Sequence, residues 1–82
     1  MTYFYEIRSF NHKGECFDVR EYDCGKVAYD KFYRFSSNAK RVHKRAKKAG
    51  FEPTFLAYKM QLVKRDENYL GLKELANWKV GA

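Results

Sequence analysis

The chain is poor in cysteine and proline and has no long apolar run. Its 82 residues include two cysteines and one proline, and two cysteines are too few for the disulfide framework of a small secreted domain. No apolar stretch approaches the roughly 20 residues that a membrane-spanning helix needs, and no secretory signal segment follows Met1. We therefore expect a cytoplasmic protein that does not contact a membrane.

Signatures of metal binding and catalysis are also missing. The cysteine and histidine residues lack the paired spacing of zinc ligands; they are His12, Cys16, Cys24 and His43. The sequence contains no P-loop and no Ser/His/Asp arrangement. The carboxylates of Glu6, Asp18 and Glu21 fall on expected strands, where charged side chains usually face water. We expect no metal, no cofactor and no enzymatic activity.

Apolar and aromatic side chains, in contrast, are plentiful. Hydrophobic residues make up 45% of the chain and aromatic residues 18%, whereas disordered chains hold few aromatics. Large rings are also an economical way to fill a small core. A chain of this length is expected to form one domain, which we place at residues 1–82.

The first half of the sequence predicts a β-hairpin. Residues 3–10 and 15–22 are rich in aromatic and β-branched side chains, which is typical of strands. Between them, Asn-His-Lys-Gly suits a type I turn closed by a left-handed glycine bulge. This turn predicts a register with Asn11 opposite Glu15, Ser9 opposite Phe17, Ile7 opposite Val19 and Tyr5 opposite Glu21. Ile7, Phe17 and Val19 would then share one face.

A long helix is predicted from about residue 24 to residue 49. Apolar side chains recur there at alternating spacings of four and three: Ala28, Phe32, Phe35, Ala39, Val42, Ala46 and Ala49. Asp23 is a favourable N-cap, Gly50 supplies a stop, and Pro53 prevents continuation. Residues 36–38 favour caps, so two shorter helices are the alternative. The stripe keeps its phase through this segment and favours one helix.

The remaining sequence predicts one more strand and a short helix. Residues 54–65 alternate in polarity as a strand does, and Asp66 would cap a helix with Tyr69, Leu72, Leu75 and Ala76 on one side. The predicted fold is therefore α+β: a three-stranded, mainly antiparallel sheet packed on one long amphipathic helix, in the order β-β-α-β-α.

The sheet face that points away from the long helix is expected to be apolar. It would carry Phe4, Phe10, Phe55, Ala57 and Val63, too many apolar side chains for a face open to water. We expect residues 69–80 to cover it. The alternative is that a second copy in a homodimer, or another partner, covers this second sheet face.

Positive charge is concentrated in the long helix. Residues 31–51 hold eight of the seventeen Lys and Arg and none of the ten Asp and Glu, so the rest of the chain sums to −1 and the net charge of +7 comes entirely from this segment. Six like-charge pairs at i,i+3 and i,i+4 cost roughly 1–3 kcal/mol in total. An anionic partner, either nucleic acid or an acidic protein surface, would offset this repulsion. The alternative is a solvated helix face.

The sequence thus predicts a small basic nucleic-acid-binding protein that contacts the phosphate backbone through the exposed face of its long helix, with little sequence specificity. The candidate contacts to DNA or RNA are Arg34, Lys40, Arg41, Lys44, Arg45, Lys47 and Lys48, with Tyr29 and Tyr33 as candidates for stacking on bases. His43 is interpreted as a boundary residue. The alternative function is a small phage-type inhibitor or adaptor that binds a host protein through the basic helix or the aromatic sheet face.

Overall fold

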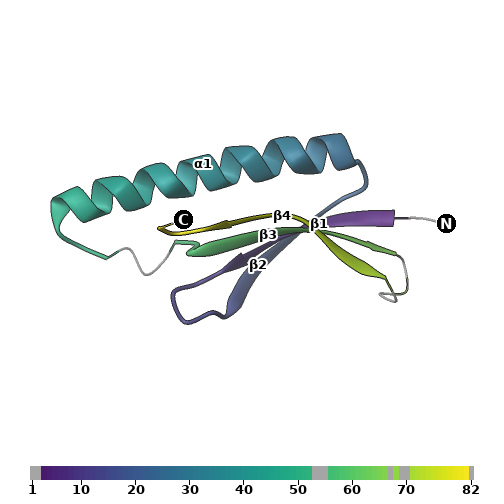
Figure 1. The fold of residues 1–82 in the computed structure, drawn as a ribbon, viewed down its shortest axis with the longest axis horizontal. Coiled ribbons are helices and arrows are strands. Elements are labelled where there is room, and N and C mark those ends of the chain that lie inside the picture. The colour runs from purple at the N-terminus through teal and green to yellow at the C-terminus, as the bar shows by residue number, and fades with distance from the viewer. Residues whose placement is uncertain (1–2, 53–55, 67, 69–70, 82) are drawn as a thin grey trace.

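The computed structural model describes residues 3–52, 56–66, 68 and 71–81 (Figure 1). Its elements are β1 (Tyr3–Phe10), β2 (Cys16–Tyr22), α1 (Gly25–Ala49), β3 (Lys59–Asp66) and β4 (Leu72–Lys79). The strands form one antiparallel sheet in the order β2-β1-β3-β4, and α1 lies along one face of it (Figure 1). The α+β class is confirmed. The three-stranded sheet and the order β-β-α-β-α are wrong, because the last element is a strand.

A loop organised by Asp66 explains why β4 replaces the predicted helix. The Asp66 carboxylate accepts hydrogen bonds from the backbone N–H groups of Asn68 (3.1 Å) and Gly71 (3.0 Å). The Asp66 N–H donates to the Gly71 carbonyl (3.2 Å). An aspartate that accepts from nearby backbone N–H groups can begin a turn as readily as a helix, and here it begins the β3–β4 turn. Tyr69, expected on the helix, lies outside the described residues.

The β1–β2 turn forms as predicted, but the register beyond it differs. Gly14 has a φ of 84°, and Asn11 donates its N–H to the Glu15 carbonyl (2.9 Å). The pairing then shifts between Ser9 and Phe10, where β2 holds one extra residue. The observed pairs are Phe10 with Cys16, Ser9 with Asp18, Ile7 with Arg20 and Tyr5 with Tyr22.

The predicted pairs of Ser9 with Phe17, Ile7 with Val19 and Tyr5 with Glu21 are therefore wrong. A shift of one residue moves every following side chain to the opposite face of the strand. Val19 consequently lies opposite Arg8 rather than Ile7. Phe17 and Val19 are 51% and 52% exposed instead of sharing the core with Ile7.

Helix α1 runs unbroken from Gly25 to Ala49, so the prediction of one helix is confirmed. Its N-cap is Cys24, which makes no side-chain capping bond, and not Asp23. At the other end Gly50 adopts the left-handed conformation (φ 80°), and Phe51 donates its N–H to the Ala46 carbonyl (3.1 Å). This is the predicted glycine stop.

The buried side of α1 is turned slightly away from the predicted stripe. Ala28, Phe32, Ala39 and Ala46 are buried as expected. Ser36 is also buried, while Val42 is 36% exposed and Ala49 is exposed. Small side chains therefore line much of the contact, and the helix can lie close to the sheet.

The core lies between α1 and one sheet face. It comprises Ile7, Ala28, Phe32, Ala39, Ala57, Met60 and Leu62. Ala57 belongs to this core rather than to the second sheet face, and Phe55 lies outside the described residues. The expectation that residues 69–80 cover the second face is wrong, because the described part of this segment extends the sheet as β4 (Figure 1).

Candidate nucleic-acid interface

A groove lies where one flank of α1 meets the end of β4. Its volume is about 340 Å³, and it is lined by Lys40, His43, Lys44, Lys47, Trp78, Lys79, Val80 and Gly81. We call this set of residues the lysine groove. Lys40, Lys44 and Lys47 are one helical turn apart from one to the next, so their side chains lie along the same flank. Lys79 of β4 also lines the groove. Its side chain points to the opposite sheet face from that of Trp78, because it pairs with Lys59, which lies over Phe10 on the helix-free face.

The lysine groove is a site of one charge sign. Four of its eight lining residues are lysines, and none is acidic. In the described part of the chain, none of these four lysines forms an ion pair. The three lysines of α1 along one flank of the hollow raise the local positive potential, which favours an anion there.

A second hollow continues the lysine groove along α1. It measures about 240 Å³ and is lined by Phe32, Tyr33, Ser36, Ser37, Lys40, Asn77 and Trp78. Lys40 and Trp78 belong to both hollows, so the two are contiguous. Tyr33 is 60% exposed, and its ring stacks on Tyr29 at 6.4 Å between centroids. This hollow adds hydroxyl, amide and aromatic groups to the cationic ones.

An aromatic cluster of His43, Tyr58 and Trp78 packs beside the lysine groove. The His43 ring lies edge-on to Tyr58 at 4.6 Å and tilted towards Trp78 at 6.2 Å. His43 Nε2 lies 2.8 Å from the Ala57 carbonyl oxygen and is therefore the protonated nitrogen that donates to it. Burial, followed by the nearby Glu52 carboxylate, raises the pKa of Tyr58. These contacts fix the orientation of the rings beside Trp78.

The structure divides the predicted site residues into two groups. Lys40, Lys44 and Lys47 line the lysine groove, and Tyr33 lines the adjoining hollow. The other predicted residues line neither hollow; they are Tyr29, Arg34, Arg41, Arg45 and Lys48. Of these, Arg34 lies 3.7 Å from Asp30 in an exposed ion pair.

Trp78 and Lys79 are the site residues that sequence reasoning missed. Both belong to a segment that was interpreted partly as a helix, so their position opposite α1 could not be foreseen. One signal was available: the only tryptophan of the chain is followed directly by a lysine. Read as a strand, this segment places Trp78 on the sheet face beside the basic helix and Lys79 on the opposite face.

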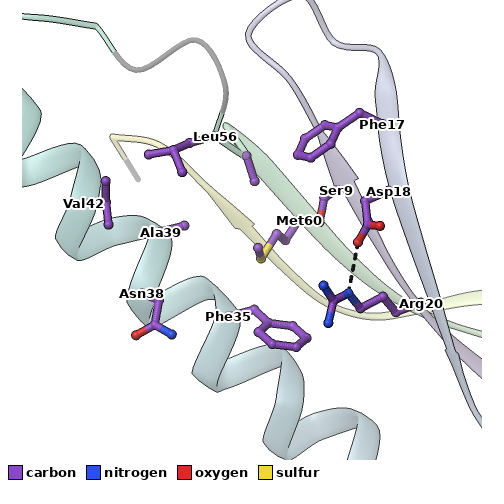
Figure 2. Close-up of a pocket in the computed structure, with 11 residues that line it drawn as sticks. Ser9, Phe17, Asp18, Arg20, Phe35, Asn38, Ala39, Val42, Leu56 and Met60 are labelled. Carbon is purple, nitrogen blue, oxygen red and sulfur yellow. Dashed lines mark hydrogen bonds and ion pairs between the residues drawn. The ribbon is translucent and has the colours of Figure 1, made fainter.

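An apolar hollow of about 270 Å³ lies on the other flank of α1, towards β2 (Figure 2). Phe35 and Val42 of α1 face Phe17 and Arg20 of β2 across it. The Arg20 guanidinium lies 4.9 Å from the centre of the Phe35 ring and pairs with Asp18 at 3.2 Å. Because α1 is rotated about its axis relative to the predicted orientation, these apolar side chains remain partly open to solvent.

The helix-free face of the sheet carries Phe4, Phe10 and Val63 as expected, but a charged cluster lies among them. Arg65 pairs with Glu6 (2.6 Å) and with Glu21, and Arg8 pairs with Glu6 (2.9 Å). The side chains of Arg65 and Glu6 are only 7% and 5% exposed. Burial opposes ionisation of Glu6, but the hydrogen bonds and charges of Arg65 and Arg8 outweigh it and lower the pKa of Glu6.

The aromatic rings of this face are covered by cations. The Arg65 guanidinium lies 4.7 Å from the centre of the Phe4 ring, and the Lys59 ammonium lies 5.3 Å from that of Phe10. These contacts reduce the apolar surface that Phe4 and Phe10 present.

Comparison with known proteins gives no further guide to this site. No family model matches the chain, and neither a curated protein nor a solved structure is similar to it. Among the described residues, no group of three or more His, Cys, Asp or Glu is placed to hold a metal ion. No helix in that part of the chain is long and apolar enough to span a membrane.

Proposed function

We propose that this protein binds nucleic acid by phosphate contacts from the lysine groove. The observation that supports this proposal is the alignment of Lys40, Lys44 and Lys47 along one hollow between α1 and β4 without an acidic residue in its lining. Cations near the end of a helix are favoured by its dipole, which accounts for Lys47. It does not account for Lys40 and Lys44, which lie before the last turn of α1.

The proposed contacts are to the backbone and carry little sequence information. Lysine ammonium groups are compact point charges on flexible stems, which suit phosphates better than the fixed hydrogen-bonding edges of bases. The protein should therefore bind many sequences with similar affinity. Its partners are DNA or RNA rather than one defined site.

Two matched triple variants test the proposal. K40E/K44E/K47E reverses the charge of the three groove lysines of α1. R41E/R45E/K48E reverses the charge of three basic residues of the same helix that lie outside the groove. Each variant lowers the net charge from +7 to +1. Affinity for labelled oligonucleotides is measured by fluorescence anisotropy, and folding is checked by circular dichroism.

We expect the groove variant to lose binding and the control variant to retain most of it. Equal losses in both variants would show that net charge alone decides binding, and the groove would then not be the site. A groove variant that binds like the wild type contradicts the proposal altogether.

A protein-binding inhibitor or adaptor is the second candidate function. It is favoured by the apolar hollow between α1 and β2, where Phe17 is 51% exposed. Large exposed apolar side chains beside a hollow are common at protein interfaces. Capture of one stoichiometric protein that resists nuclease and is lost in Phe17→Lys would support this candidate.

A further inference from the structure

We infer that the ligand of the lysine groove is single-stranded nucleic acid, one base of which stacks on Trp78. This inference rests on the proposed function and specifies the ligand class of the same site. It is carried by the position of Trp78, which lines both contiguous hollows beside Lys40.

Trp78 lies where a base attached to a bound phosphate would reach. The side chain is partly buried, and His43 and the core support it on one side. The remaining surface faces the groove, whose lysines would hold the backbone. Stacking on an aromatic ring beside a cationic track is how many proteins bind single strands without reading their sequence.

The second hollow provides a place for the base itself. Tyr33 and Trp78 line it from α1 and β4, and among the described residues these two rings make no contact with each other. Ser37 and Asn77 are exposed at its edge. A planar base stacked on Trp78 would thus find the Ser37 hydroxyl at its edge.

Duplex nucleic acid cannot use this arrangement. Inside a duplex both faces of each base are covered by the neighbouring bases, so a side chain can stack only after the base has been extruded, which costs a few kcal/mol. The lysines can still contact the phosphates of a duplex. The structure therefore predicts a preference for single strands that comes from Trp78 and not from the lysines.

The sole tryptophan of the chain reports directly on the stacking. A single-stranded oligonucleotide should quench the fluorescence of Trp78, whereas an abasic strand of the same length, which keeps the phosphates, should bind more weakly and leave the fluorescence nearly unchanged. Trp78→Leu should weaken binding to the normal strand by roughly 5- to 150-fold, the loss of one stacked base. It should not affect binding to the abasic strand or to duplex.

Two further variants keep the test decisive. Trp78→Phe retains a ring at the position and should lose less affinity than Trp78→Leu, and melting curves show whether either variant is folded. Tyr3→Leu removes an exposed aromatic ring of β1 that lines neither hollow, and it should bind like the wild type.

The possible failures are distinguishable. Tight binding of the abasic strand together with unquenched Trp78 would overturn the stacking inference and leave phosphate binding standing. Equal affinity of the wild type for single strand and duplex would overturn it as well. Failure of every oligonucleotide to bind would overturn the proposed function and this inference together.

Discussion

Arg65 shows how a charged side chain can lie within a small sheet. Its guanidinium pairs with carboxylates from β1 and β2 and covers the ring of Phe4, so one side chain links three strands. Removing charges from water costs several kcal/mol per ion unless the groups are paired and hydrogen-bonded. Glu6 meets this condition, because it accepts hydrogen bonds from both Arg65 and Arg8.

Glu6 should make the stability of the protein fall in acid. Its pKa is lower in the folded chain than the ordinary value of 4.5. The stabilisation is therefore fully present above about pH 4.5 and is lost as the pH falls through the lower, folded value. We expect Glu6→Gln to cost about 2 kcal/mol at neutral pH and to remove this part of the acid dependence.

Urea unfolding at a series of pH values measures this effect. Glu74→Gln is the matched control, because it removes a carboxylate from an exposed position of β4. A constant difference in the free energy of unfolding between wild type and Glu6→Gln, from neutral pH to pH 3, would contradict the assignment to Glu6.

At the scale of the elements, the apolar periodicity predicted the extent of α1 well, but it predicted poorly which side of the helix is buried. The stripe from Ala28 to Ala46 identified a single helix, and Gly50 identified its end. Burial of Ser36 was not predictable from polarity, since its hydroxyl is satisfied within the helix by donation to the Tyr33 carbonyl (3.3 Å). A polar group that is satisfied locally can lie at a close contact where a larger apolar side chain would not fit.

The strands show what local sequence leaves open. Asp66 and the apolar residues after it fit a capped helix as well as a turn and a strand, and only pairing with β3 decides between them. The extra residue in β2 is likewise set by the packing of the sheet. The three groove lysines of α1 were predictable because a helix fixes their mutual spacing, whereas Trp78 and Lys79 required the correct sheet.

The end of α1 depends on the left-handed conformation of Gly50. At a φ of 80° an L side chain is strained, although a Cβ there would meet no atom within 4 Å. We expect Gly50→Ala to lower the free energy of unfolding by about 1 kcal/mol. In Gly71→Ala the Cβ would lie 3.5 Å from an Asp66 oxygen, without a positive φ, so this control should be nearly neutral.

Thermal or urea denaturation of the two variants gives the comparison. Chemical synthesis of a chain with D-alanine at position 50 adds a direct test, because the left-handed conformation is the natural one for a D-residue. Equal losses for the L- and D-alanine forms would show that strain at this glycine is not the cause.

The whole molecule is elongated, with extents of 49 × 24 × 18 Å, and its charge is distributed unevenly along α1. The 25 residues of the helix span about 37 Å. Lys and Arg side chains occur on both the groove side and the outer side of this helix. A ligand in the groove would therefore contact three lysines, whereas a ligand lying across the helix would contact up to the eight Lys and Arg side chains of residues 31–51.

The salt dependence of binding distinguishes these two modes. For a single strand, the logarithm of the binding constant falls with the logarithm of salt concentration with a slope of about −0.7 per phosphate contacted. Contacts from Lys40, Lys44 and Lys47 alone therefore predict a slope near −2, whereas eight contacts across the helix would give one near −6. Lys44→Ala should make the slope shallower by about 0.7, and Lys48→Ala should leave it unchanged. Titrations at several salt concentrations measure all three slopes, and a steep slope that responds equally to both substitutions would place the ligand across the helix rather than in the groove.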